Sequence, residues 1–283
     1  MQLVRYSAGS TPQWGVLRDD QVIPLSGLQE KITFQQLNSP GFLRVIKDAA
    51  AAAESEAVPI EDVKLLAPVP RPGKIVCVGL NYHDHAEEQD EEIPERPLLF
   101  AKAGTSVTNP DDPIVHPADI EQVDFEVELG VVIGQTAKDV NAENSFDYVA
   151  GYTAIDDVSG RDAQFEDGQY FRGKSYDTFA PIGPTFVPEP DIDPHNLDVA
   201  CRVNGETKQS SNTSEFIFGV DEIIEYISGI MTLRPGDVIS TGTPGGVGIF
   251  RVPPELLEPD DIVTVEIEGI GALTNQVVAE DEI

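Results

Sequence analysis

The chain has 283 residues, of which 50 are acidic and 18 are basic, and its formal net charge is −32. Nucleic acids and anionic membranes bind through basic patches, so this charge argues against both as partners. Hydrophobic residues make up 40% of the chain, as in an ordinary globular protein, and no stretch approaches the roughly 18 apolar residues of a membrane span. We therefore expect a folded protein with no nucleic-acid or membrane partner.

The acidic residues are dispersed along the chain rather than gathered in one tail, so disorder is not expected. Such a composition is typical of proteins from salt-loving organisms, for example a halophilic archaeon, where concentrated salt screens the repulsion between like charges. Cys77 and Cys201 lie far apart, and the first residues contain no apolar run typical of a secretory signal. These features predict two reduced, buried thiols in a cytoplasmic protein.

The first part of the chain predicts a small α+β unit. Residues 2–6 and 13–24 are predicted to form strands, with a turn at Asp19 and Asp20, and residues 42–55 to form an alanine-rich helix. Three prolines and a glycine between residues 65 and 73 are typical of a linker. We therefore predict a small N-terminal domain over residues 1–69 and a catalytic domain over residues 70–283. The small domain is too short to hold much core alone, so it should pack on the larger one.

The larger part of the chain predicts many short strands and few helices. Apolar or alternating runs predict strands over residues 74–79, 97–102, 148–155, 233–239 and 262–267. Helical turns are predicted over residues 81–92, 158–167 and 220–231. Residues 106–117, 170–184 and 187–194 are predicted to be loops. With 24 glycines and 22 prolines, this pattern predicts a largely β, α+β fold.

Residues 123–130 alternate strictly between apolar and acidic side chains, which predicts a half-buried strand. Glu126 and Glu128 would then stand on one face, roughly 7 Å apart along the strand. Two carboxylates this close repel each other unless a cation lies between them, so the pattern fits a site for a metal ion. Taken alone, it fits a solvated acidic face of this very acidic chain slightly better.

Other polar residues strengthen the case for a site. Asp157 follows a predicted strand and could supply a third carboxylate, and three carboxylates without cysteine or clustered histidine favour Mg²⁺, Mn²⁺ or Ca²⁺. Lys174 lies in a glycine- and aromatic-rich segment. It is either part of a functional site or an ordinary surface lysine. His85 and Glu88 have the spacing of a base oriented by a carboxylate, or of a surface pair on a helix.

Residues 240–248 are a glycine-rich stretch that follows a predicted strand. Its backbone N–H groups could bind a carboxylate or a phosphate, or the stretch could be a plain tight turn. It lacks the Gly-Lys-Ser/Thr ending of a nucleotide-binding P-loop and does not fit the pattern Gly-x-Gly-x-x-Gly. We therefore do not expect nucleotide binding.

Taken together, six segments resemble the fumarylacetoacetate hydrolase family. They occur in family order over residues 79–88, 97–102, 124–129, 156–164, 173–179 and 234–248. The resemblance implies a mixed β-roll or sandwich catalytic domain and a homodimer. It also implies a Mg²⁺ ion, or Mn²⁺ or Ca²⁺ in its place, held by Glu126, Glu128 and Asp157.

The resemblance also implies catalytic residues. His85 and Glu88 match the family's water-activating pair, on a segment that closes over bound substrate. Lys174 matches the lysine that stabilises a developing enolate. The implied substrate-binding set, in which the arginine supports the site, is Lys102, Arg161, Gln164 and Thr243. Three positions depart from the family pattern, and they are Ala103 for a proline, Asp156 for an asparagine and Gly160 for an alanine.

The implied function is that of a metal-dependent enzyme acting on a small 2-oxo acid, in which the ion would act as a Lewis acid toward an enolate. We expect hydrolysis of a C–C bond or a proton shift on a dicarboxylic or acylpyruvate-type acid, as in 2-hydroxyhepta-2,4-diene-1,7-dioate isomerases and acylpyruvases. Oxaloacetate tautomerase or decarboxylase is an alternative. So is a 2-keto-3-deoxy sugar-acid dehydratase, although that branch lacks the pair that His85 and Glu88 match. An acidic metal-binding scaffold protein is the non-enzymatic alternative.

The charge of the chain generates a prediction about salt. We expect the melting temperature to fall as KCl is lowered from molar to millimolar concentration, because the screening length grows from about 3 Å at 1 M to about 30 Å at 0.01 M. Thermal unfolding followed by circular dichroism measures this dependence. A melting temperature that stays constant over the whole range would refute the prediction.

Overall fold

The largest sheet of the computed structural model, which describes residues 1–9 and 11–283, has twelve strands. In spatial order, ten of them are β4 (Val58–Pro59), β3 (Gln21–Pro24), β2 (Gln13–Arg18), β1 (Gln2–Ser7), β14 (Ala180–Pro188), β12 (Val149–Asp156), β11 (Val127–Ile133), β17 (Val238–Ser240), β6 (Ile75–Gly79) and β7 (Leu98–Lys102). Two further strands pair with this path, β5 (Lys64–Leu66) on β1 and β8 (Val107–Thr108) on β14.

A second sheet has five strands and packs against the first. Its order is β16 (Glu206–Asn212), β15 (Asp198–Val203), β18 (Ile262–Ile267), β19 (Gly271–Ala279) and β9 (Ile114–His116). Strands β15, β18 and β19 contact β11, β12 and β14, so the two sheets form a sandwich whose core lies between them. A small two-stranded sheet joins β10 (Val123–Asp124) to β13 (Ser159–Gly160).

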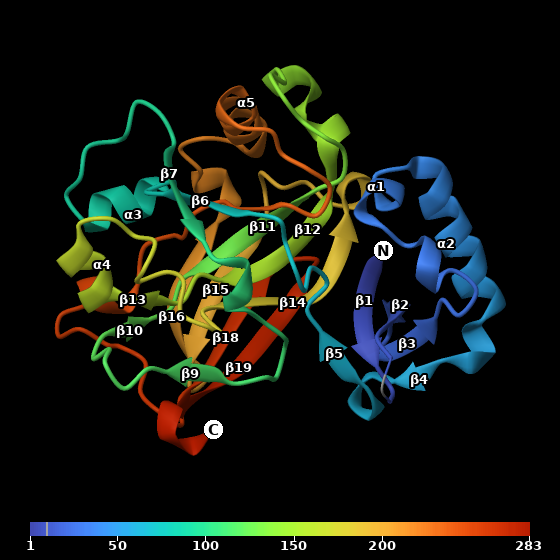
Figure 1. Cartoon of the computed structure of the whole chain (residues 1–283), viewed down its shortest axis with the longest axis horizontal. Helices are drawn as coiled ribbons and strands as arrows, with labels where there is room; N and C mark the ends of the chain where they lie inside the picture. Colours follow the sequence, from blue (N-terminus) through green and yellow to red (C-terminus); the bar gives the residue numbers. More distant parts are fainter. Residues whose placement is uncertain (10) are drawn as a thin grey trace.

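In the described part of the chain, five α-helices surround the sheets. They are α1 (Phe34–Leu37), α2 (Pro40–Ala52), α3 (His83–Glu88), α4 (Arg161–Asp167) and α5 (Val220–Ile230). Figure 1 shows α1 and α2 beside the N-terminal strands and α3 and α4 at the opposite side of the molecule. Helix α5 buries Val220, Ile223, Ile224 and Ile227 on one face. Among the described residues, no helix combines the length and apolar character needed to cross a membrane.

The α+β class predicted from the sequence is confirmed. Most strand pairs are antiparallel, but β6 with β17, β8 with β14 and β9 with β19 are parallel, so the sheets are mixed. The predicted strands at residues 74–79, 97–102, 148–155 and 262–267 and the predicted helices correspond to observed elements within a few residues. The two cysteines are free and buried, as predicted.

Some predicted loops are wrong in part. Residues 106–117 contain the short strands β8 and β9. Strand β14 (Ala180–Pro188) includes the end of the loop expected over residues 170–184 and the start of the loop expected over residues 187–194. Strand β14 contains three prolines, which ordinarily argue against a strand, so its sequence concealed it. Strands β15, β16 and β19 carry no pattern that predicted them from the sequence.

The half-buried strand expected over residues 123–130 is also wrong. The segment divides into β10 and β11, and its acidic side chains are as buried as its apolar ones. At the break two backbone N–H groups donate to side chains, Phe125 N to Asp124 Oδ1 and Glu126 N to Asp156 Oδ1, while Glu126 O still accepts from Asp157 N. The acidic face is therefore turned into the protein, where its charges need partners.

The N-terminal residues pack on the central sheet, as expected. Leu3, Ile23 and Ile46 share one apolar cluster with Val132 of β11 and Phe186 of β14. β1 also pairs with β14, so the N-terminal strands extend the large sheet. The domain boundary near residue 70 stays a prediction.

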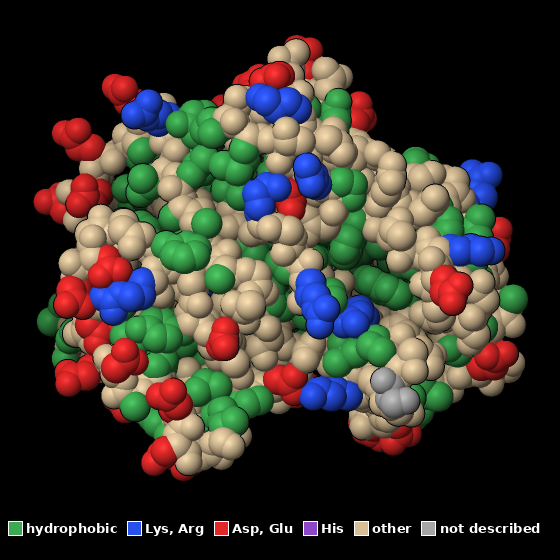
Figure 2. Space-filling view, in the orientation of Figure 1, with side chains coloured by type: hydrophobic (Ala, Val, Ile, Leu, Met, Phe, Trp, Pro, Cys, Tyr) green, Lys and Arg blue, Asp and Glu red, His purple; other side chains and the backbone are tan. Residues whose placement is uncertain are grey.

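Acidic side chains are scattered over the whole face of the molecule in Figure 2 rather than gathered in one patch. Lys and Arg side chains lie among them on the same face. On this face, therefore, the negative charge of the chain is distributed and is not concentrated at one place.

The packing of β12 can be tested at Gly151. A Cβ atom there would meet the carbonyl oxygen of Val187 and the ring of Phe186. We expect Gly151→Ala to lower the free energy of unfolding by about 1–3 kcal/mol, because a packed interior has no room for the methyl group. Gly229 of α5 has open space around it, so Gly229→Ala is the matched control and should raise stability by about 0.5–1 kcal/mol. Urea unfolding measures both, and an unchanged Gly151→Ala protein would contradict the packing.

Candidate active site with an acidic triad

Three carboxylates gather at one end of β11 and β12. Glu126 directly precedes β11, Glu128 is its second residue, Asp157 follows β12, and the antiparallel register pairs Val127 with Asp156. One oxygen atom from each of the three acids lies within 4.8 Å of the others, and all three residues are buried. The prediction that Asp157 lies in one cluster with the two glutamates is thus confirmed.

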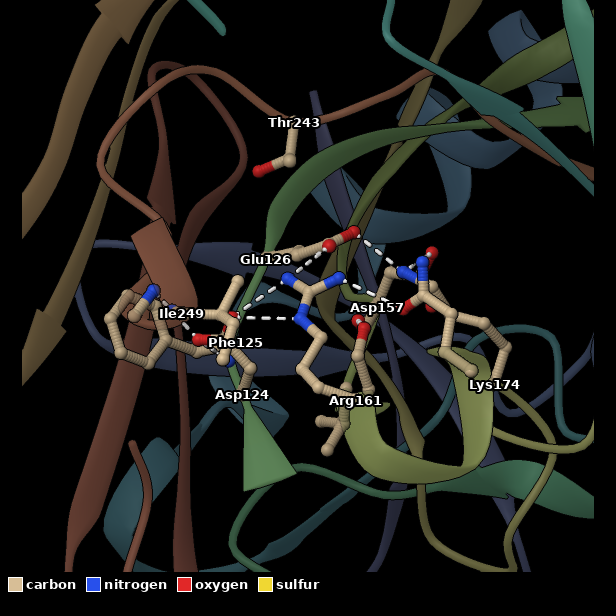
Figure 3. A network of polar contacts seen from close by, with 12 residues as sticks. Asp124, Phe125, Glu126, Asp157, Arg161, Lys174, Thr243 and Ile249 are labelled. Carbon is tan, nitrogen blue, oxygen red and sulfur yellow. Dashed lines mark hydrogen bonds and ion pairs between the residues drawn. The ribbon is translucent and has the colours of Figure 1, made fainter. Parts of the chain in front are cut away.

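Basic side chains surround this triad. Lys174 Nζ lies 2.7 Å from Glu126 Oε2 and 2.9 Å from Asp157 Oδ2, so the lysine joins two of the acids. Lys102 Nζ lies 2.5 Å from Asp157 Oδ1, and Arg161 Nη2 lies 2.6 Å from Glu126 Oε1. Figure 3 shows Lys174 and Arg161 reaching Glu126 from different elements. Lys174 is fully inside the protein and is not a surface lysine.

The electrostatic balance differs between the two glutamates. Burial by itself would raise the pKa of Glu126, but the charges of Lys174 and Arg161 outweigh burial and lower that pKa to about 2. Burial, Asp157 and Glu126 together raise the pKa of Glu128 well above its ordinary value. The protein's own cations therefore compensate Glu126 well and Glu128 poorly.

A divalent ion fits this arrangement. Three carboxylates are the hard oxygen ligands that Mg²⁺, Mn²⁺ and Ca²⁺ prefer. Ser240 Oγ and Gly242 N both donate to Oε2 of Glu128, at 2.5 and 2.9 Å, so among the described residues Oε1 remains available as a ligand. An ion bound by all three acids would bring positive charge to Glu128, which the protein's own basic side chains compensate less than they compensate Glu126.

Asp156 stands where the family pattern has an asparagine. Its Oδ1 accepts a hydrogen bond from Glu126 N at 2.9 Å, and its buried Oδ2 has no hydrogen-bond partner in the described part of the chain. Burial raises the pKa of Asp156 to about 7, so a large share of it is uncharged at neutral pH. The uncharged acid resembles the amide that it replaces.

Asp124 is a structural centre of the site that the sequence analysis did not identify. It accepts hydrogen bonds from Arg161 Nε at 2.9 Å and from Arg161 Nη2 at 2.8 Å, and Figure 3 shows the arginine between Asp124 and Glu126. Arg161 Nη1 also donates to Gln164 Oε1 at 3.1 Å. Asp124 thereby orients both predicted substrate-binding residues of α4. Its alternation with apolar neighbours gave no signal of this role.

Helix α3 brings the predicted catalytic pair beside the glycine-rich loop over residues 240–248. His85 is buried, and its Nδ1 lies 3.3 Å from Glu88 Oε2. Gly246 N donates to Glu88 Oε1 at 3.0 Å, and Gly245 N donates to Asp84 Oδ1 at 3.1 Å. The backbone N–H groups of this loop bind carboxylates of the chain itself, so the loop is more than a tight turn.

One cavity of about 270 Å³ unites most of the predicted residues. The predicted site residues in its lining are His85, Glu126, Glu128, Arg161, Gln164, Lys174 and Thr243. Its apolar walls include Leu98, Phe100, Phe165, Tyr170 and Phe250. Lys102, Asp157 and Glu88 are outside the lining, and the ammonium of Lys102 is buried against Asp157. A substrate contact by Lys102 stays a prediction.

Gln209 is a second residue that the sequence analysis missed. Its Oε1 accepts a hydrogen bond from Val127 N at 3.0 Å, and its Nε2 donates to Thr243 Oγ1 at 2.8 Å. Thr243 therefore uses its oxygen as an acceptor toward Gln209 and keeps its hydroxyl proton for another partner. Gln209 lies on β16, a strand that was not predicted, so no local pattern could have placed it here.

Comparison with known proteins identifies the family. Residues 74–278 match the model described as fumarylacetoacetate (FAA) hydrolase C-terminal, and residues 1–68 match the model described as Rv2993c-like, N-terminal. The chain belongs to the fumarylacetoacetate hydrolase family. The chain is similar to a relative from Rattus norvegicus that is named "Oxaloacetate tautomerase Fahd2a, mitochondrial". The two are 48% identical over 231 residues, which cover 81% of this chain and 74% of the relative.

Solved structures of the family agree with this fold. The fumarylacetoacetate hydrolase from psychrophilic Exiguobacterium antarcticum is 39% identical, with a TM-score of 0.86 over 99% of this chain and 100% of that one. A structure described as 2-hydroxyhepta-2,4-diene-1,7-dioate isomerase from Mycobacterium marinum is 37% identical, with a TM-score of 0.78 over 99% of each chain. The fold and family expected from the sequence are therefore confirmed.

The metal site can be tested at Glu126. We expect Glu126→Ala to weaken binding of Mg²⁺ or Mn²⁺ by more than about 100-fold, because it removes a carboxylate ligand and leaves Lys174 and Arg161 nearby to repel a cation. Isothermal titration calorimetry measures the affinity. Glu121→Ala, at an exposed glutamate close by in sequence, is the matched control and should bind like the wild type. Unchanged affinity in Glu126→Ala would exclude the triad as the site.

Proposed function

We propose that this protein is an enzyme that moves a proton at C3 of a small 2-oxo acid, and that oxaloacetate is its substrate. The observation that carries the proposal is the cavity in which His85 and Lys174 face the same space beside the acidic triad. A keto–enol interconversion needs a group that moves a proton and a positive group that stabilises the enolate oxygen. The similarity to a relative named oxaloacetate tautomerase supports this choice of substrate.

Lys174, His85 and Glu88 have different roles in this reaction. Burial opposes the charge of Lys174, but Asp157 and Glu126 raise its pKa above the ordinary value, so its ammonium stays charged and donates to the 2-oxo oxygen. His85 takes the proton from the enol hydroxyl or delivers it to C3, and Glu88 keeps the imidazole in place. A divalent ion in the triad would act as a Lewis acid toward the carboxylate and the 2-oxo oxygen.

Two uncharged donors, from Gln164 and Thr243, would orient the substrate, and Arg161 fixes the amide of Gln164. Because Arg161 Nη1 already donates to Gln164 Oε1, the amide nitrogen of Gln164 is left to donate to a substrate oxygen. The hydroxyl proton of Thr243 has the same freedom, because its oxygen accepts from Gln209. These two donors suit the second carboxylate of a dicarboxylic acid.

Hydrolysis of an acylpyruvate-type acid is the second candidate. It is favoured by the pairing of His85 with Glu88, which could activate a water molecule as well as move a substrate proton. Attack of that water on the distal carbonyl carbon would break the C–C bond, and the electron pair would leave with a pyruvate-like enolate. The similarity to a structure described as 2-hydroxyhepta-2,4-diene-1,7-dioate isomerase supports acids of greater length. Product analysis separates the candidates, because only hydrolysis yields two acids.

The other activities and properties expected from the sequence stay predictions. A decarboxylase would release carbon dioxide from oxaloacetate through the same enolate, and a sugar-acid dehydratase would have no use for the His85–Glu88 pair. The homodimer and the cytoplasmic location rest on the family resemblance and the composition. A non-catalytic scaffold protein would bind the ion without turning over any 2-oxo acid.

The role of His85 can be tested by substitution. We expect His85→Asn to lower kcat/KM for enol oxaloacetate by about 10²–10⁴-fold, because a positioned acid or base is lost. Loss of the enol absorbance, measured with Mg²⁺ in concentrated KCl, follows the reaction. Calorimetry should find the affinity for Mg²⁺ unchanged in the variant, because His85 is not in the triad.

Two outcomes would overturn the proposal. A His85→Asn protein with the wild-type rate would remove this residue from the reaction. A wild-type protein that binds Mg²⁺ but converts no member of a panel of 2-oxo acids would favour the scaffold alternative.

A further inference from the structure

Gln89 contacts the imidazole of His85, and none of the roles described above uses this contact. The glutamine follows α3 directly, four residues after His85, so the two side chains lie on the same face of the helix. Its Nε2 lies 2.8 Å from His85 Nε2 and 3.4 Å from the carbonyl oxygen of His85. Both residues line the 270 Å³ cavity.

The neighbours of His85 assign its proton. Nδ1 faces the carboxylate of Glu88, which can only accept a hydrogen bond, so the proton of the neutral ring belongs on Nδ1. Nε2 then presents a lone pair, and a lone pair needs a donor.

The orientation of the Gln89 amide agrees with this assignment. The atom that lies near His85 Nε2 also lies near the carbonyl oxygen of His85, which is another acceptor. Only the NH₂ end of the amide can donate to both. The imidazole is therefore held from two sides, by an acceptor at Nδ1 and by a donor at Nε2.

We propose that Gln89 is a positioning residue, which holds the lone pair of His85 Nε2 toward the cavity and yields it when substrate binds. Before binding, the amide N–H occupies the lone pair and keeps the ring from turning. When the acidic proton of a substrate reaches Nε2, the amide gives up this bond and donates to a substrate oxygen instead. The kinetic part rests on the proposed function, whereas the tautomer of His85 does not.

Two substitutions of Gln89 separate the effect of its N–H donor from the effect of the length of its side chain. Gln89→Met keeps the length of the side chain but removes its donor. Gln89→Glu keeps the length and places a carboxylate at Nε2, so His85 would lie between two carboxylates and bind a second proton. Glu87→Gln is the matched control, because Glu87 is exposed on the same helix.

Nitrogen NMR of protein labelled with ¹⁵N-histidine is the decisive experiment. The chain has four histidines, and loss of one signal set in His85→Asn assigns His85. At mildly alkaline pH we expect Nδ1 protonated and Nε2 unprotonated in the wild type, a shift of the Nε2 resonance in Gln89→Met, and protonation of both nitrogens in Gln89→Glu. A wild-type proton on Nε2, or a Gln89→Glu spectrum identical to that of the wild type, would overturn the inference.

Kinetics provide the second readout. We expect Gln89→Met to lower kcat about tenfold, the effect of losing the one hydrogen bond that the amide makes to the substrate oxygen during proton transfer, with KM within about threefold of the wild type. Glu87→Gln should keep the wild-type constants, and all variants should melt like the wild type. A Gln89→Met protein with unchanged kcat would overturn the role of Gln89. Absence of turnover in the wild type, together with the expected NMR changes, would overturn the proposed function and leave the assignment of Gln89 standing.

Discussion

The whole site depends on the compensation of negative charge that has been taken out of water. Burial of an unpaired carboxylate is costly, and here a group of them lies in one small region of the core. The buried acids are Asp124, Glu126, Glu128, Asp156 and Asp157. Three of the few basic residues of the chain are buried among them, and they are Lys102, Arg161 and Lys174. The pairing is uneven, and the shortfall at Glu128 makes the pocket suited to a divalent cation.

The glycine-rich loop supplies the remaining compensation with backbone atoms. The N–H groups of four of its glycines each donate to a different carboxylate. In chain order the acceptors are Glu128 for Gly242, Asp84 for Gly245, Glu88 for Gly246 and Asp124 for Gly248. Gly242 and Gly246 have φ angles of 98° and 101°, which other residues rarely adopt, so these close approaches require glycine. One loop thus connects a carboxylate of the acidic triad, the predicted catalytic pair and the partner of Arg161.

This arrangement links helix α3 to the acidic triad. His85 is held by Glu88 and Gln89, Glu88 is held by the loop, and the same loop donates to Glu128. A continuous set of hydrogen bonds therefore joins the imidazole of His85 to the acidic triad, and both line one cavity through His85, Glu126 and Glu128. The rigid sandwich beneath supplies the register of β11 and β12 that brings the acids together.

The sequence by itself determined the fold class, most of the helices, some of the strands and the residues of the acidic triad, because periodicity and ordered motifs are local properties of the chain. It could not determine that the acidic face of residues 123–130 is buried, because burial depends on Arg161 and Lys174, which are distant in sequence. Strand β14 was concealed by its prolines, and the role of Gln209 depended on β16. Asp124 and Gln89 became recognisable only through their partners. Tertiary structure decides these points, since a hydrogen bond or an ion pair exists only when folding brings both of its members together.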